Sequence, residues 1–204
     1  MNERTIRRPK GPAVIFLIQA ISYFFTLFSS ALMGVIFDYP EKLPLRSVLT
    51  FLIWGATNLF LSIVLFSKNY NNLLLVGVGV LLVPSIFGLF FNITPYLISE
   101  IIFCLILFAF TYIMVKMPET PIREKTVKFR FVIPVLQFLL VLISTIQTIQ
   151  GAYEKFFENA GSYPVDTMNV AIALFPSILG AITGFLPVLC YVLLANWLAD
   201  PYEK

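Results

Sequence analysis

The chain has 204 residues, of which 59% are hydrophobic and 12% charged, and its formal net charge is +3. Soluble domains carry about 25% charged residues, so this composition predicts an integral membrane protein. The sequence contains no histidine, which excludes a histidine-based catalytic triad, a histidine-ligated zinc or haem, and a histidine proton relay.

Six runs of the sequence are long and apolar enough to cross a bilayer, which takes about 20 mainly apolar residues. In chain order the predicted spans are 13–37, 47–67, 72–91, 96–115, 131–149 and 168–194. The first run holds 25 residues, whereas the apolar region of a signal peptide holds about 7–15, so we expect a retained anchor. The third and fourth spans should part at 92–95, where Thr94 can cap a helix that starts at Pro95.

The basic residues predict the orientation, because Lys and Arg gather in the short loops on the cytoplasmic side. With the N-terminus inside, only Lys42, Arg46 and Lys155 of the 14 basic residues lie in outside loops. We therefore expect an all-α bundle in one integral membrane domain, 1–204, with both termini cytoplasmic. No organelle signal is visible, which favours the cell (inner) membrane of a prokaryote. Aromatic residues at helical spacing in the outside loop 150–166 predict a short helix on the membrane surface.

Two similar segments suggest an internal duplication. Residues 84–88 read Pro-Ser-Ile-Phe-Gly and residues 176–180 read Pro-Ser-Ile-Leu-Gly, and each segment is followed by a second proline at the same distance, Pro95 or Pro187. With three spans in each half, the second copy would enter the membrane inverted, as in many secondary transporters that bind substrate on Pro- and Gly-interrupted helices. The alternative is a chance similarity, because these residue types are common in membrane helices.

Glu100 is the only formally charged residue within a predicted span. An intramembrane carboxyl group costs free energy and is by default a functional candidate, here for coupling to a proton or another cation. The alternative is an interfacial anchor, because Glu100 lies in the first turns of its helix, where a carboxylate complements the helix N-terminus.

Other polar and small residues in the spans are weaker candidates. The amides in the spans include Gln19, Asn58, Gln137 and Gln147, which must find a partner or line a polar cavity. The predicted path for a solute or ion comprises Glu100, Asn58, Gln137, Pro84, Gly88, Pro176 and Gly180. The pairs Ser30–Gly34 and Gly180–Gly184 form small faces for helix packing, and Gly77 and Gly79 also favour close packing.

These features favour a compact transporter or channel-like protein for a small solute, which uses the third and sixth spans. The alternative is a non-catalytic subunit or assembly factor of a larger membrane complex, since the spans are poor in polar groups. One intramembrane acid does not supply the paired groups that catalysis needs, and Cys104 and Cys190 lie in apolar runs. We therefore expect that the protein is not an enzyme and that it binds no metal or cofactor. The expected partners are the lipid bilayer and either a membrane protein or a second copy, with no nucleic acid.

Overall fold

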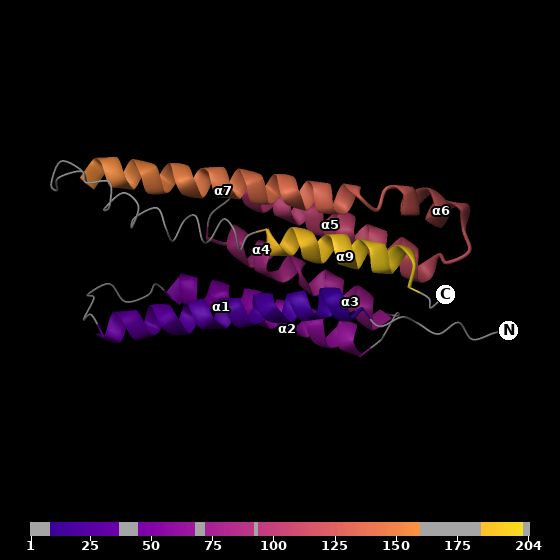
Figure 1. The fold of residues 1–204 in the computed structure, drawn as a ribbon, viewed down its shortest axis with the longest axis horizontal. Helices are drawn as coiled ribbons and strands as arrows, with labels where there is room; N and C mark the ends of the chain where they lie inside the picture. Colours follow the sequence, from indigo (N-terminus) through magenta and orange to yellow (C-terminus); the bar gives the residue numbers. More distant parts are fainter. Residues whose placement is uncertain (1–8, 37–44, 68–71, 92–93, 160–184, 202–204) are drawn as a thin grey trace.

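The computed structural model describes residues 9–36, 45–67, 72–91, 94–159 and 185–201, and the regular structure within these ranges is entirely helical. The helices lie along one axis, and successive passes of the chain along it run in opposite directions (Figure 1). In chain order the helices are α1 (Lys10–Ile36), α2 (Leu45–Phe66), α3 (Asn72–Val80), α4 (Leu82–Leu89), α5 (Pro95–Lys116), α6 (Pro121–Lys128), α7 (Val132–Asn159) and α9 (Leu186–Ala199). The predicted all-α fold is confirmed for these ranges.

Four stretches of the described chain are long and apolar enough to cross a membrane. They are Lys10–Phe28, Val48–Phe66, Asn72–Leu89 and Pro95–Lys116, and α6 with α7 makes a fifth if their 40° bend lies within one span. The apolar helix α9 has 14 residues and covers about 21 Å, less than the roughly 30 Å of a hydrocarbon core. Residues 168–184 of the sixth predicted span lie outside the described residues, so the count of six stays a prediction.

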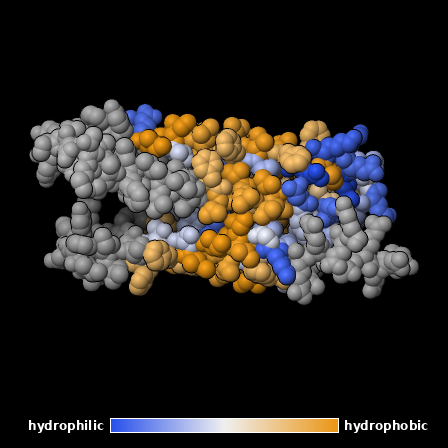
Figure 2. Space-filling model, in the orientation of Figure 1, coloured by the Kyte–Doolittle hydropathy of each residue, from blue (hydrophilic) through white to orange (hydrophobic). Residues whose placement is uncertain are grey.

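The surface of the bundle suits a lipid environment. Large apolar side chains are exposed along its length, such as Phe25 at 68% and Phe90 at 82%. Figure 2 shows hydrophobic residues over the middle of the molecule and hydrophilic residues most densely at the end where α6 lies. The arrangement is compatible with a multi-pass membrane protein, because in a bilayer these apolar side chains would contact lipid tails and not water.

The helix starts follow local capping chemistry. Thr94 caps α5, since its hydroxyl accepts a hydrogen bond from the Leu97 amide at 3.2 Å, and Pro95 is the first helical residue, as predicted. Thr120 and Pro121 begin α6 by the same device, between the fourth and fifth predicted spans. A cap of this kind is worth about 1 kcal/mol.

Helix α7 is longer than the fifth predicted span. It continues without a break to Asn159, so the helix predicted to lie separately on the membrane surface is instead the end of α7. Gln150 donates a side-chain hydrogen bond to Glu154 one turn later, at 3.1 Å. The glycine at 151 did not end the helix, because a lone glycine costs only about 1 kcal/mol in a helix interior.

Pro84 interrupts the third span, as the sequence predicts. Helix α3 ends at Val80 and α4 begins at Leu82, because Pro84 has no amide proton to donate to the carbonyl of Val80. The Leu81 amide instead donates to Val78 at 3.2 Å, in a tighter turn. The Leu81 carbonyl at the break accepts a hydrogen bond from the thiol of Cys104 on α5, with the sulfur 3.8 Å from the oxygen. The interruption thereby links the third span to α5.

Short polar contacts also join the helices across the core. The Ser62 hydroxyl on α2 donates to the Ala13 carbonyl on α1 at 2.8 Å, and the Cys190 thiol on α9 donates to the Pro12 carbonyl at 3.6 Å. At the other end of α9, Arg123 donates to the carbonyl of Ala199 at 3.2 Å. An arginine suits this position because the last carbonyls of a helix lack partners and carry partial negative charge.

Gly77 and Gly79 pack against different helices, which gives a matched test of close packing. A Cβ on Gly77 would lie 3.0 Å from the fully buried Leu61 of α2, whereas one on Gly79 would lie 3.5 Å from Phe108 of α5. We expect Gly77→Ala to lower the free energy of unfolding by about 1 kcal/mol or more through overpacking. Gly79→Ala should keep or raise it, because alanine is the better helix former. Melting temperatures in detergent would measure both variants, and equal values would contradict this account.

The remaining packing and repeat predictions lie largely outside the described part. Pro176, Gly180 and Gly184 fall within 160–184, and the contacts predicted for Ser30 and Gly34 rest on side chains that the structure does not describe. The internal duplication therefore stays a prediction.

Candidate functional site

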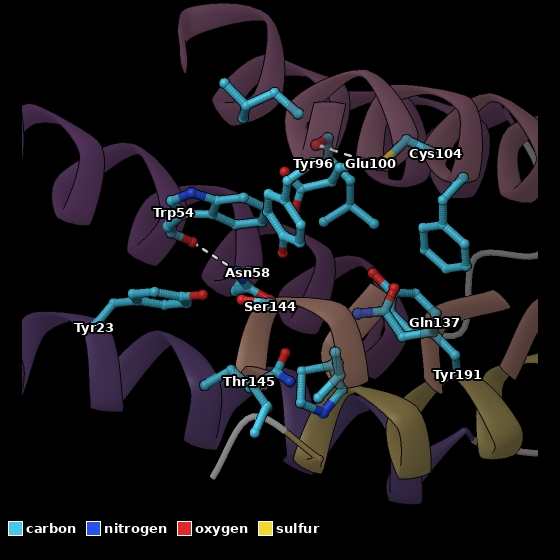
Figure 3. Close-up of a pocket in the computed structure, with 16 residues that line it drawn as sticks. Tyr23, Trp54, Asn58, Tyr96, Glu100, Cys104, Gln137, Ser144, Thr145 and Tyr191 are labelled. Carbon is cyan, nitrogen blue, oxygen red and sulfur yellow. Dashed lines mark hydrogen bonds between the residues drawn. The ribbon is translucent and has the colours of Figure 1, made fainter. Parts of the chain in front are cut away.

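A cavity of about 410 Å³ lies within the bundle, between α1, α2, α5, α7 and α9 (Figure 3). Its described lining residues are Gln19, Tyr23, Trp54, Asn58, Leu81, Tyr96, Leu97, Glu100, Phe103, Cys104, Gln137, Val141, Ser144, Thr145, Pro187 and Tyr191. Ligand pockets in proteins range over about 300–1,000 Å³, so this cavity has room for a small molecule.

The polar side chains predicted from separate spans converge on this cavity. Glu100 of α5, Asn58 of α2 and Gln137 of α7 all line it, and Gln19 of α1 joins them. Asn58 is 4% exposed, and its amide nitrogen donates to the Trp54 carbonyl at 2.8 Å, which fixes the orientation of the amide group. The amide nitrogen of Gln19 is buried and has no hydrogen-bond partner within the described protein. Both amides are thus positioned to meet a ligand or water.

Glu100 carries the only formal charge among the described lining residues. Part of its side chain remains accessible in the cavity, while its Oε2 is buried with no hydrogen-bond partner among the described residues. Ser85 of α4 approaches the carboxyl group, yet the Ser85 hydroxyl also lacks a well-formed hydrogen bond. An unsatisfied buried polar atom costs about 1–3 kcal/mol, and more when it is charged. A bound ligand or water would remove that cost.

Pro84 and Gly88 are not among the residues that line the cavity. Pro84 sets the helix break that precedes Ser85, and Gly88 allows close approach of α5, since a Cβ there would lie 3.0 Å from Leu97. Leu97 itself lines the cavity. These two residues therefore shape the backbone around the site, while Pro176 and Gly180 lie outside the described residues.

Sequence reasoning missed the aromatic lining, which comes from α1, α2, α5 and α9: Tyr23, Trp54, Tyr96, Phe103 and Tyr191. The rings of Tyr23 and Trp54 are stacked, with centroids 5.9 Å apart and an angle of 16°. Those of Phe103 and Tyr191 meet edge to face at 5.0 Å. Figure 3 shows Tyr23, Trp54 and Tyr96 on one flank of the cavity and Gln137 and Tyr191 on the other.

A spacing signal for these aromatic residues was present in the sequence. Tyr23 follows Gln19 by four residues, Trp54 precedes Asn58 by four, and Tyr96 precedes Glu100 by four. Residues four apart lie on the same face of a helix, so each aromatic ring lines the same side as its polar neighbour.

A second hollow of about 420 Å³ adjoins the central cavity at the end where α5 begins. Its lining residues are Thr94, Pro95, Tyr96, Ser144 and Gln147. Tyr96 and Ser144 belong to both hollows, and their side chains share a hydrogen bond between α5 and α7. This bond therefore lies where the two spaces meet.

The site suits non-covalent binding of a small molecule. Among the described residues, no three His, Cys, Asp or Glu side chains come together as a metal site would require. Cys104 and Cys190 are buried free thiols, and only Cys104 lines the cavity. Comparison of the chain with protein-family models, with curated proteins and with solved structures gives no match.

Proposed function

We propose that the protein binds a small solute in the central cavity and passes it across the membrane. The observation that carries this proposal is the convergence of Glu100, Asn58 and Gln137, from three different helices, on one cavity. Polar groups in the hydrocarbon region need partners, and these side chains turn toward a shared space with room for a ligand. In a protein that served only to pack against other helices, we would expect them to be paired with one another.

The proposal includes the full membrane arrangement. In this arrangement the chain crosses the cell (inner) membrane six times, and both termini lie in the cytoplasm. The helix ends support this orientation, because α1 begins and α9 ends at the same end of the bundle as the basic helix α6 (Figure 1). The proposal also retains the inverted repeat, in which the break at Leu81 would have a counterpart in the sixth span. Its support is the similarity of residues 84–88 and 176–180.

Water access to the cavity tests the proposal without knowledge of the solute. Thr145 lines the cavity, whereas the neighbouring Ile146 faces outward from α7 and is 55% exposed. In a variant with alanine at Cys104 and Cys190, we expect Thr145→Cys to react with the neutral, water-soluble reagent 2-hydroxyethyl methanethiosulfonate. Ile146→Cys should remain unmodified, because a thiol in contact with lipid does not form the reactive thiolate. Mass spectrometry of the protein in liposomes would measure both reactions.

If Thr145→Cys reacts no faster than Ile146→Cys, the proposal is contradicted, because water then does not reach the cavity. The competing function, a subunit that acts through helix contacts, predicts that outcome. It also predicts a partner of fixed stoichiometry when the tagged protein is purified in mild detergent.

A further inference from the structure

We propose that the solute is an organic cation, a small alkylammonium or quaternary ammonium compound. This inference rests on the proposed function and specifies the chemistry of its ligand. Its basis is the combination, in one cavity, of five aromatic side chains, one carboxyl group with an unpaired oxygen, and no basic residue among the described lining.

The charge of the cavity favours a positive ligand. Glu100 is the only lining residue with a formal charge in the described chain, and its Oε2 has no partner there. A cation would pair with this carboxylate. A neutral ligand would leave it uncompensated, and an anion would be repelled in surroundings where charges interact more strongly than in water.

The aromatic residues favour an ammonium group with alkyl substituents. The faces of Trp and Tyr rings attract cations, and aromatic cages are the usual means of binding quaternary ammonium groups. Tyr96 lies four residues before Glu100 on the same face of α5, and both line the cavity together with Tyr23 and Tyr191, so aromatic rings and the carboxyl group share this space. A ligand there would contact a ring and the carboxylate together.

The size and donor set disfavour a bare metal ion. Calcium and magnesium take six or more oxygen ligands at about 2.0–2.6 Å, and the described lining offers a single carboxylate, with its other side-chain oxygens on amides and hydroxyl groups spread over several helices. A space of about 410 Å³ is large for such an ion but suits an organic molecule. The amides of Asn58 and Gln137 would then hydrogen-bond a polar group on the ligand.

Choline and its uncharged isostere, 3,3-dimethylbutan-1-ol, form the test pair, because they differ in the charge of one atom. Isothermal titration of the full chain in detergent should give a dissociation constant for choline at least tenfold below that of the isostere. The Trp197→Phe variant leaves Trp54 as the only tryptophan, and its fluorescence should change with choline at the same concentration. Tyr23→Leu should weaken choline binding at least fivefold. Phe25→Leu, which removes an exposed ring two residues away, should not.

The outcomes separate this inference from the proposed function. Equal binding of choline and the isostere would overturn the organic cation and leave a solute cavity in place. Absence of binding by both compounds, with Thr145→Cys still modified from water, would also overturn the organic cation alone. Absence of binding together with an unreactive Thr145→Cys would overturn both proposals.

Discussion

Glu100→Gln is expected to lower choline affinity about a hundredfold and to abolish choline uptake into liposomes. The glutamine keeps the shape and most hydrogen-bonding capacity of the side chain but removes the only formal charge of the described cavity lining. Two unit charges 4 Å apart attract by about 4 kcal/mol at an effective dielectric constant of 20. We expect desolvation to offset part of this, which leaves about 2.7 kcal/mol, or two orders of magnitude in the dissociation constant.

The controls distinguish loss of charge from loss of fold. Glu119→Gln removes the same charge from an exposed position outside the cavity and should leave affinity unchanged. Glu100→Asp keeps the charge at a shorter reach and should retain part of the binding. The melting temperature of Glu100→Gln should equal or exceed that of the native protein, because a neutral amide costs less than a carboxylate in such surroundings. A variant that binds choline with native affinity would show that Glu100 serves only as an anchor.

Local chemistry accounts for the parts of the fold that the sequence predicts well. Uncharged runs define the spans, and charged residues bound them. Pro84 breaks the third span because it lacks one amide proton, and the Thr94–Pro95 pair starts α5 because both residues suit a helix N-terminus. The end of α7 was misjudged because the apolar run stops at Ile149 and charged residues follow from Glu154, yet α7 continues through them to Asn159. Residues 160–184 leave the sixth span and the repeat as predictions.

The cavity itself was only partly predictable. Asn58, Gln137 and Glu100 could be identified because polar side chains cost free energy in the hydrocarbon region unless they have a partner. The aromatic residues did not, because rings occur on both the inner and the outer faces of these helices. Tyr23 lines the cavity while Phe25, two residues later, is exposed, and composition alone does not separate the two. In a bilayer both faces of a helix are apolar, so the hydrophobic periodicity that orients helices in soluble proteins is weak.

Tyr96→Phe is expected to raise the rate at which Thr145→Cys reacts by up to about tenfold. The Tyr96–Ser144 hydrogen bond joins two residues that line both the central cavity and the hollow at the beginning of α5, where the two spaces meet. Its loss should favour states in which the two spaces connect. A net hydrogen-bond contribution of about 0.5–1.5 kcal/mol corresponds to a change of roughly twofold to tenfold in the open fraction. The ring itself stays, so the aromatic lining is retained.

A double-mutant cycle shows whether the bond itself controls access. Ser144→Ala should raise the rate as Tyr96→Phe does, and the double variant should raise it no further, because either change removes the same bond. A membrane-impermeant reagent should reach Thr145→Cys faster from the side on which α5 begins, since the second hollow lies at that end. If the effects of Tyr96→Phe and Ser144→Ala on the rate are additive, the bond between these residues does not control access. If the reagent reaches Thr145→Cys faster from the side of α6, the ligand enters from that side. Entry beside Tyr96 would bring a cation to this ring first and then to Glu100, one helical turn further along the same face of α5.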